Sequence, residues 1–164
     1  LLYGRELPRH ALDEWRRPLY TARSEGKGLV VEAFRGSSKT TTLTVAFTAF
    51  RIGLEPHKSF LIIQASEDQA TDSAGQVADL IAKNPGWRKV FPQVRPDRTA
   101  GWGASGYDVR RMDMDYGAWR ALCAAERGKD PTLVGLGYQS RAVVGKDPKG
   151  MLVVDDSNDE SHTT

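Results

Sequence analysis

Apolar residues follow two patterns along the chain, continuous runs and stripes with helical spacing. Apolar runs occupy residues 29–33, 60–65, 132–138 and 151–154, and the first two runs are each followed by a helical stripe. A near-continuous apolar run is typical of a strand buried on both faces of a parallel sheet. Strands that alternate with amphipathic helices predict an α/β chain, with a mainly parallel central sheet flanked by helices. The stripes are Leu43, Ala46, Phe47 and Phe50, and then Ala70, Ala74, Val77 and Ile81.

Capping and breaking residues set the expected ends of the second helix. Ser66 and Gln69 form a capping box, and the sequence at residues 84–86, Asn-Pro-Gly, ends the stripe. Residues 101–106 spell G-x-G-x-x-G, but this motif neither follows an apolar strand nor opens a clear helix, so we expect a loop. Residues 107–111 alternate like a short strand, and residues 116–126 have the pattern of a short amphipathic helix.

The N-terminal stretch, residues 7–22, predicts a helix that covers one side of the sheet, with Pro18 limiting its length. Its large apolar side chains allow a second interpretation, stacking on an adenine base. Core packing is favoured because large aromatic residues are usually buried for their area alone. The side chains concerned are Leu12, Trp15, Leu19 and Tyr20.

Length and composition predict one ordinary soluble domain. The 164 residues carry a formal charge of +2 with 27% charged residues, so the chain is not strongly basic. The single Cys123 excludes an internal disulfide, the three scattered histidines give no zinc-ligand spacing, and a reducing cytosolic setting fits best. No apolar run approaches the roughly 20 residues of a membrane span, and no signal-peptide pattern is present. Because the first residue is not Met, we expect a fragment of a longer chain.

The strongest chemical signal follows the first apolar run. Ala33 to Thr40 aligns with the phosphate-binding pattern G-x-x-x-x-G-K-[ST], keeping Lys39 and Thr40 but placing Ala33 and Ser38 where glycines usually stand. Backbone N–H groups of such a loop, at a helix N-terminus, favour an anion. A basic turn between a strand and a helix is the plainer alternative. The residues expected to bind a nucleotide are Phe34, Arg35, Gly36, Ser37, Ser38, Lys39, Thr40 and Thr41.

A second signal stands at the end of the last apolar run, where Asp155 and Asp156 follow four apolar residues. An acid in this position matches the strand that carries the Mg²⁺-linked aspartate of phosphate-loop NTPases. Taken alone, two acids are more often a polar stop after a buried strand. A lysine-threonine loop after one strand and an acid after another make chance a weaker explanation.

Five segments in order resemble the ATPase domain of large terminase subunits, the DNA-packaging motors of tailed bacteriophages and related viruses. The resemblance covers about three-quarters of the chain, from Leu29 onward, and its specificity lies in the ordered set. It implies a single phosphate-loop ATPase domain of the additional-strand catalytic glutamate (ASCE) type over residues 1–164, with a C-terminal nuclease domain of the longer protein elsewhere. The segments are Phe34-Arg-Gly-Ser-Ser-Lys-Thr40, Phe60-Leu-Ile-Ile-Gln-Ala-Ser66, Asn84-Pro85 before Phe91-Pro92, Asp130-Pro-Thr132, and Gly145 to Asp156.

The resemblance also implies roles for individual residues. Arg35 matches an arginine proposed to sense or stabilise the γ-phosphate, Lys39 and Thr40 match the phosphate and Mg²⁺ ligands, and Asp155 matches the Mg²⁺-linked aspartate. Asp156 stands where a glutamate commonly activates the attacking water, and its side chain is shorter by one methylene. Glu160 is the alternative base, provided that a turn brings it back to the site.

The implied activity is hydrolysis of ATP with Mg²⁺, driving double-stranded viral DNA into a procapsid. Family partners are the portal protein, the small terminase subunit and further copies in a ring, usually a pentamer. The setting is the cytoplasm of an infected bacterium, on the procapsid. Arg141 is the preferred candidate for an arginine donated to a neighbouring subunit. Arg110, Arg111 and Arg120 compete with it, and a solvated surface role is at least as probable for each.

Two other classes of function stay open. A helicase-like, nucleic-acid-dependent ATPase would share both motifs but would need a second motor lobe. A nucleotide-binding module without turnover would explain the loss of both loop glycines and of the glutamate.

Overall fold

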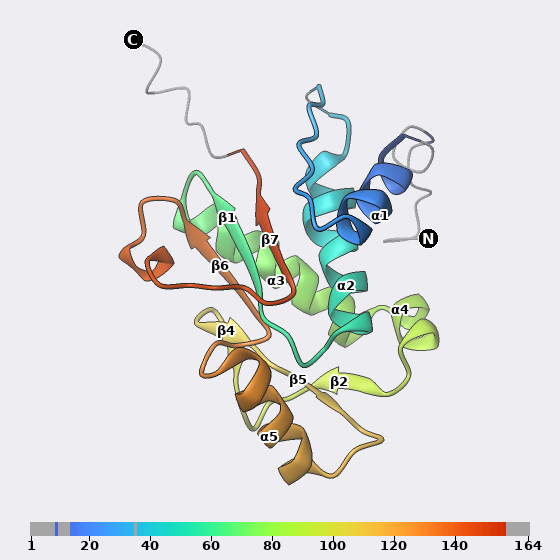
Figure 1. The fold of residues 1–164 in the computed structure, drawn as a ribbon, viewed down its shortest axis with the longest axis vertical. Coiled ribbons are helices and arrows are strands. Elements are labelled where there is room, and N and C mark those ends of the chain that lie inside the picture. Colours follow the sequence, from blue (N-terminus) through green and yellow to red (C-terminus); the bar gives the residue numbers. More distant parts are fainter. Residues whose placement is uncertain (1–8, 10–13, 35, 157–164) are drawn as a thin grey trace.

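The computed structural model describes residue 9 and residues 14–34 and 36–156 (Figure 1). The helices are α1 (Arg16–Ser24), the π-helix η2 (Thr40–Phe47), α2 (Thr48–Leu54), α3 (Glu67–Lys83), α4 (Pro85–Val90), α5 (Tyr116–Arg127) and the 3-10 helix η3 (Arg141–Val143). The strands are β1 (Phe60–Gln64), β2 (Val94–Pro96), β3 (Trp102–Gly103), β4 (Gly106–Tyr107), β5 (Val109–Arg111), β6 (Leu133–Gly137) and β7 (Met151–Val154).

The central sheet has five strands in the order β3-β4-β6-β1-β7 and is mixed. β1 pairs in parallel with β6 on one side and with β7 on the other, whereas β4 runs antiparallel to both β3 and β6. The predicted α/β class is therefore correct, but the expectation of a mainly parallel sheet is not. β2 and β5 form a separate antiparallel ribbon, on which α5 packs.

The departure from a parallel sheet arises at residues 101–107, where we expected a loop and then a single strand. Trp102 pairs with Tyr107 and Gly103 with Gly106, so this segment folds back as a hairpin against β6. The rings of Trp102 and Tyr107 stack edge to face, with centroids 5.3 Å apart. Two aromatic residues with glycines between them therefore stabilise a hairpin that hydrophobic periodicity alone does not indicate.

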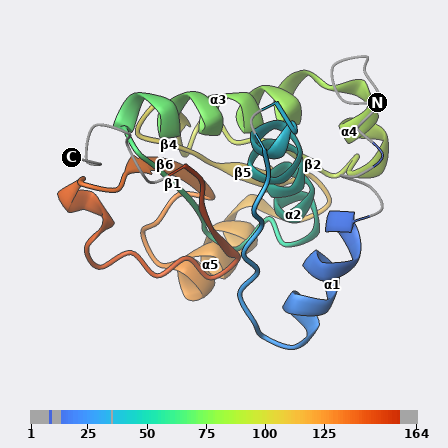
Figure 2. The same ribbon diagram turned by 90° about the horizontal axis from the view of Figure 1, so that it is seen from above.

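The main core lies between the sheet and the helices η2, α2 and α3. Figure 2 shows α3 lying along one face of the sheet. The α3 boundaries agree with the sequence signals: the Ser66 hydroxyl accepts a hydrogen bond from the Gln69 amide at 3.2 Å, and Asn84 ends the helix. Buried side chains from both sides meet in this layer, including Val45, Ile52, Phe60, Ile62, Val77, Ile81 and Leu133.

Helix η2 continues into α2, but it buries a different face from the expected one. Val45, Ala49 and Ile52 are almost fully buried, whereas Leu43 and Phe47 are half-buried and line a cavity. Thr44 and Thr48 are as deeply buried as the apolar residues. Periodicity missed this face because threonine counts as polar, and because a π-helix turns less per residue than the assumed α-helix.

Residues 27–34, which include the predicted first strand, form no strand in the structure. Leu29 and Val30 are exposed, and a cavity of about 370 Å³ separates this segment from β7. A strand is defined by pairing with a neighbour, so an apolar sequence without an adjacent strand stays an extended segment. The expectation of a strand directly before the phosphate-binding pattern was therefore wrong for the described structure.

The N-terminal helix α1 contains Pro18 and continues two residues beyond the expected end at residue 22, and much of the expected segment before residue 14 lies outside the described residues. It lies beside η2 and α2 and does not cover the sheet (Figures 1 and 2). Trp15 is buried, as the core interpretation requires, but Tyr20 is exposed and Leu19 is half-buried beside the cavity. The core interpretation is therefore correct for Trp15 and wrong for Tyr20, and Leu12 lies outside the described residues. Among the residues that the structure describes, no helix has the length and apolar character of a membrane span.

The contact between β6 and α3 yields a test of the fold. A Cβ atom on Gly135 would lie 2.1 Å from the backbone oxygen of Ala70, so Gly135→Ala forces α3 away from the sheet. We expect a loss of about 3 kcal/mol in the free energy of unfolding, measured by urea titration. Gly103→Ala is the matched control, because nothing lies within 4 Å of its Cβ position, and it should stay within about 0.5 kcal/mol of the unmodified chain. Equal stability of the two variants would contradict this packing.

Candidate nucleotide site

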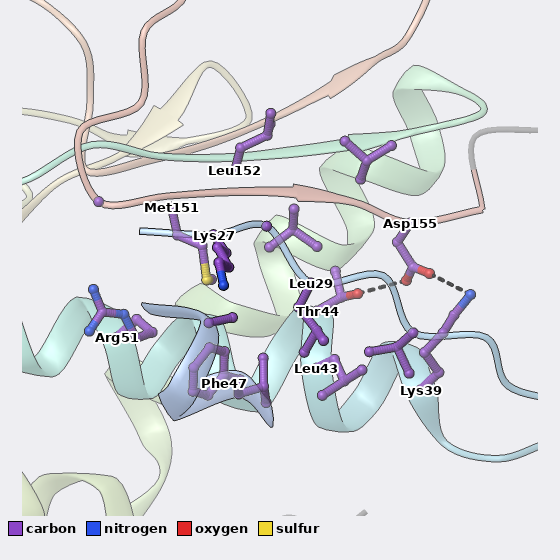
Figure 3. Close-up of a pocket in the computed structure, with 17 residues that line it drawn as sticks. Lys27, Leu29, Lys39, Leu43, Thr44, Phe47, Arg51, Met151, Leu152 and Asp155 are labelled. Atoms are coloured by element: carbon purple, nitrogen blue, oxygen red, sulfur yellow. Dashed lines mark hydrogen bonds and ion pairs between the residues drawn. The ribbon is translucent and has the colours of Figure 1, made fainter. Parts of the chain in front are cut away.

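The two chemical signals of the sequence meet in space. β1, β6 and β7 are parallel, so their carboxyl ends share one edge of the sheet, and β7 delivers Asp155 to that edge. Helix η2 begins at Thr40 beside the same edge, with Lys39 as the preceding residue. Figure 3 shows Lys39 and Thr44 directed at the carboxylate of Asp155 from different sides. The crevice outside the carboxyl ends of parallel strands is the usual ligand position in α/β sheets.

Asp155 is the centre of this site and is only 4% exposed. Its amide donates to the carbonyl of Ile63 at 2.9 Å, which fixes the backbone against β1. Its Oδ2 atom accepts hydrogen bonds from the Thr40 hydroxyl at 2.9 Å and the Thr44 hydroxyl at 2.7 Å. Its Oδ1 atom lies 3.0 Å from the Lys39 ammonium. A buried carboxylate requires such charge and hydrogen-bond compensation.

Lys39 bridges the two acids, since its Nζ atom also donates to Oδ1 of Asp156 at 2.8 Å. The hydrogen bond to Asp156 is the largest cause that raises the Lys39 pKa above its ordinary value of 10.5. Burial opposes this shift of the pKa, and the neighbouring Asp155 carboxylate reinforces it. Lys39 is therefore a firmly charged cation beside two carboxylates.

Two described residues of the loop before η2 have a positive φ, and one of them is not glycine. Gly36 has φ = 81° and Ser38 has φ = 64°, so Ser38 occupies the left-handed region that glycine favours. The amide of Ser37 donates to the carbonyl of Phe34, and the amide of Thr42 donates to that of Ser38. The serine thus keeps the local turn at a cost of about 1 kcal/mol in backbone strain.

The donor set suits a magnesium ion bound together with phosphate. Mg²⁺ is usually held by one or two carboxylates plus substrate phosphates and water, with few protein ligands. The Thr40 hydroxyl and the Asp155 carboxylate are oxygen donors in direct contact, and the Lys39 ammonium supplies the positive charge that the carboxylates need. The described residues include no cluster of three His, Cys, Asp or Glu side chains, so a metal cage built from protein alone is not present there.

The other expected catalytic residues have different positions. Asp156 is exposed, has φ = 44° and contacts Lys39. Arg141 is exposed in η3, on the connection that leaves the carboxyl end of β6, and none of its described contacts reaches Lys39 or the two acids. Arg35 and Glu160 lie outside the described residues.

The competing arginines lie on the lobe formed by β5 and α5. Arg110 stacks over the ring of Tyr116 at 4.9 Å, Arg111 is paired with Asp113, and Arg120 is exposed. Phe34 is exposed at the start of the loop, and Thr41 is half-buried one residue after Thr40.

Sequence reasoning missed Thr44, which contacts Asp155 as directly as Thr40 does. A signal was available, because Thr44 stands one helical turn after Thr40 and would lie on the same side of the helix. This spacing alone did not identify Thr44 as a site residue, since a threonine beyond the motif could equally face solvent.

The Lys39 contacts predict a pH dependence of stability. Because the pKa of Lys39 is raised in the folded state, its stabilisation is complete below the unfolded value of 10.5 and is lost as the pH rises through the folded value. The stability advantage of the unmodified chain over Lys39→Met should therefore hold at lower pH and shrink as the pH rises above 10.5 in urea titrations. When both chains also carry Asp156→Asn, this stability difference should fall less with pH, because the largest contact that raises the Lys39 pKa is weakened. An advantage that stays constant or grows over this range would contradict the ion pairs.

Comparisons of this chain with protein-family models, with curated proteins and with solved structures found no match.

Proposed function

We propose that this chain binds Mg·ATP at the Lys39–Asp155 site and hydrolyses ATP. One observation supports the proposal above all: Lys39 and Thr40, which belong to a phosphate-binding pattern, contact an acid at the end of a parallel strand 115 residues further along the chain. The combination of a lysine, a hydroxyl and an acid at a helix N-terminus suits the phosphates of a nucleotide and a divalent cation.

In the proposed mechanism, the Lys39 ammonium turns from the two carboxylates to the outer phosphates of ATP. The Thr40 hydroxyl and the Asp155 carboxylate would hold Mg²⁺, which when bound would offset the charge of the phosphates. The departure of Lys39 releases the Asp156 carboxylate, which is 69% exposed and can then accept a proton from the attacking water. Catalysis of this kind depends mainly on positioning and charge stabilisation.

The proposal assigns the remaining roles by resemblance. Arg35 would contact the γ-phosphate, and the loop backbone from Phe34 to Thr41 would wrap the phosphates. Arg141 would act on the nucleotide of a neighbouring subunit, for which its exposure on η3 leaves it accessible. Asp156 is preferred to Glu160 as the base because the end of β7 holds Asp156 beside Lys39.

The wider role that we propose is the ATPase part of a viral DNA-packaging motor. In this role, the chain would form a ring, usually of five subunits, with the portal protein, the small terminase subunit and double-stranded DNA as partners. It would work in the cytoplasm of an infected bacterium, docked on the procapsid, with a nuclease domain on the same longer polypeptide. The support is the ordered set of five sequence segments together with the contacts of Lys39 and Thr40 with Asp155. The phosphate-loop fold of the ASCE type is part of this proposal.

The Lys39→Ala variant tests the phosphate-loop assignment. Removal of the point charge should lower ATP turnover at least about 100-fold and weaken ATP binding about tenfold or more. Phosphate release and binding of a fluorescent ATP analogue measure the two effects. Lys83→Ala is the control, because Lys83 pairs with Asp79 on the surface of α3 and should keep both properties. Unchanged turnover in Lys39→Ala would rule out the assignment.

The Asp156→Asn variant identifies the base. It keeps the shape of the side chain but removes the proton acceptor, so Mg·ATP binding should persist while turnover falls about 100-fold or more. Glu160→Gln should be mild in the same assays. The reverse pattern would transfer the role to Glu160, and normal turnover in both variants would remove both acids as candidates.

ATP turnover measured with and without DNA distinguishes the proposed motor from a helicase-like ATPase and from a nucleotide-binding module. Stimulation of ATP turnover by double-stranded DNA supports the packaging motor, whereas stimulation by single strands supports a helicase-like ATPase. Binding of ATP without turnover, with or without DNA, would identify a nucleotide-binding module.

A further inference from the structure

Thr44 is a buried polar residue where packing alone would favour an apolar one. Its side chain is 1% exposed, next to the buried Val45, and its hydroxyl donates to Oδ2 of Asp155 at 2.7 Å. Valine has nearly the same shape and would fill this position without a polar atom to compensate. A buried hydroxyl without a partner costs about 1–3 kcal/mol, and the hydrogen bond to Asp155 offsets this cost at Thr44.

The same helix provides a comparison. Thr48, one turn after Thr44, is equally buried, and its hydroxyl has no hydrogen-bond partner. The two threonines therefore share burial, residue type and the continuous helical segment formed by η2 and α2, but Thr44 alone of the pair contacts the acid of the site. Any effect of the Thr44 hydroxyl on the site can thus be separated from a general effect of a buried hydroxyl in this helix.

The other side-chain contacts of Asp155 come from groups that ligand binding would divert. In the function proposed above, Lys39 turns to the phosphates and Thr40 turns to the metal. Each move removes one of the contacts to Asp155, at 3.0 Å and 2.9 Å respectively. Thr44 stands one turn deeper in η2 and is 1% exposed at the wall of the cavity, and the proposed mechanism gives its hydroxyl no partner other than Asp155. Its hydrogen bond is the described side-chain contact that can persist when the site is filled.

We propose that Thr44 is a positioning residue, whose hydroxyl fixes the carboxylate of Asp155 for the metal. This inference rests on the proposed function. With Oδ2 held by Thr44, Oδ1 keeps the direction in which it now meets the Lys39 ammonium, on the side where a cation is to be held (Figure 3). Hydrogen bonds that orient a metal-binding carboxylate commonly change metal affinity 10–100-fold when they are lost.

Thr44→Val tests the proposal, since it removes the hydroxyl and nearly preserves the shape. The Mg²⁺ concentration that gives half-maximal tightening of ATP binding should rise about tenfold, measured with a fluorescent ATP analogue. ATP binding in excess chelator, which reports the Lys39 contact with phosphate, should stay within about twofold. Thr48→Val is the matched control and should leave the Mg²⁺ dependence unchanged.

A second pair of variants keeps the test decisive if Thr44→Val does not fold. Thr44→Ser and Thr44→Ala both lose the methyl group and differ in the hydroxyl, so Thr44→Ser should retain the Mg²⁺ dependence that Thr44→Ala loses. Equal Mg²⁺ dependence in the members of this pair, or the same shift in Thr48→Val, would overturn the positioning role.

The outcomes also distinguish this inference from the function on which it rests. If the unmodified chain shows no ATP binding that depends on Mg²⁺ and on Lys39, the proposed function itself fails. If such binding is present but insensitive to the Thr44 hydroxyl, only the positioning role fails.

Discussion

A buried carboxylate governs the arrangement of the candidate site. Asp155 has lost nearly all contact with water, so its charge must be met by neighbours from elsewhere in the chain. Lys39 supplies the opposite charge, and two threonine hydroxyls supply hydrogen bonds, all from the loop and helix more than 100 residues away in sequence. The polar contacts of the site therefore also connect η2 to the end of β7, and we call this set of contacts the link.

This link joins two elements that have an open space between them elsewhere. β7 pairs with β1 on one side, and a cavity lies between β7 and residues 27–31 on the other. The contacts of Asp155 with Lys39, Thr40 and Thr44 connect η2 to β7 beside that cavity (Figure 3). The position of the loop thus depends on polar contacts at its helix end more than on the apolar segment before it.

The Lys39 ammonium can pair either with the two carboxylates or with a bound phosphate. In the described structure, the Lys39 ammonium neutralises two acids, and the raised pKa of Lys39 records that stabilisation. Phosphate would compete for this charge, so ligand binding must offset the loss of the ion pairs. The deeper hydrogen bond from Thr44 is not drawn into this competition, because the proposed mechanism leaves its hydroxyl on Asp155.

The sequence by itself determined the α/β class, the strands at residues 60–64, 133–137 and 151–154, the helices α3 and α5, and the pairing of the loop with Asp155. These features follow from local patterns, namely apolar runs, caps and a motif with its own chemistry. Only the tertiary structure decided that Ser38 accepts a positive φ, that residues 101–107 turn back as an antiparallel hairpin, and that residues 27–34 pair with no strand. It also decided that Thr44 is buried against Asp155. Such features depend on which segments become neighbours. Pairing and burial are properties of two surfaces in contact, whereas a single segment of sequence describes only one of the two surfaces.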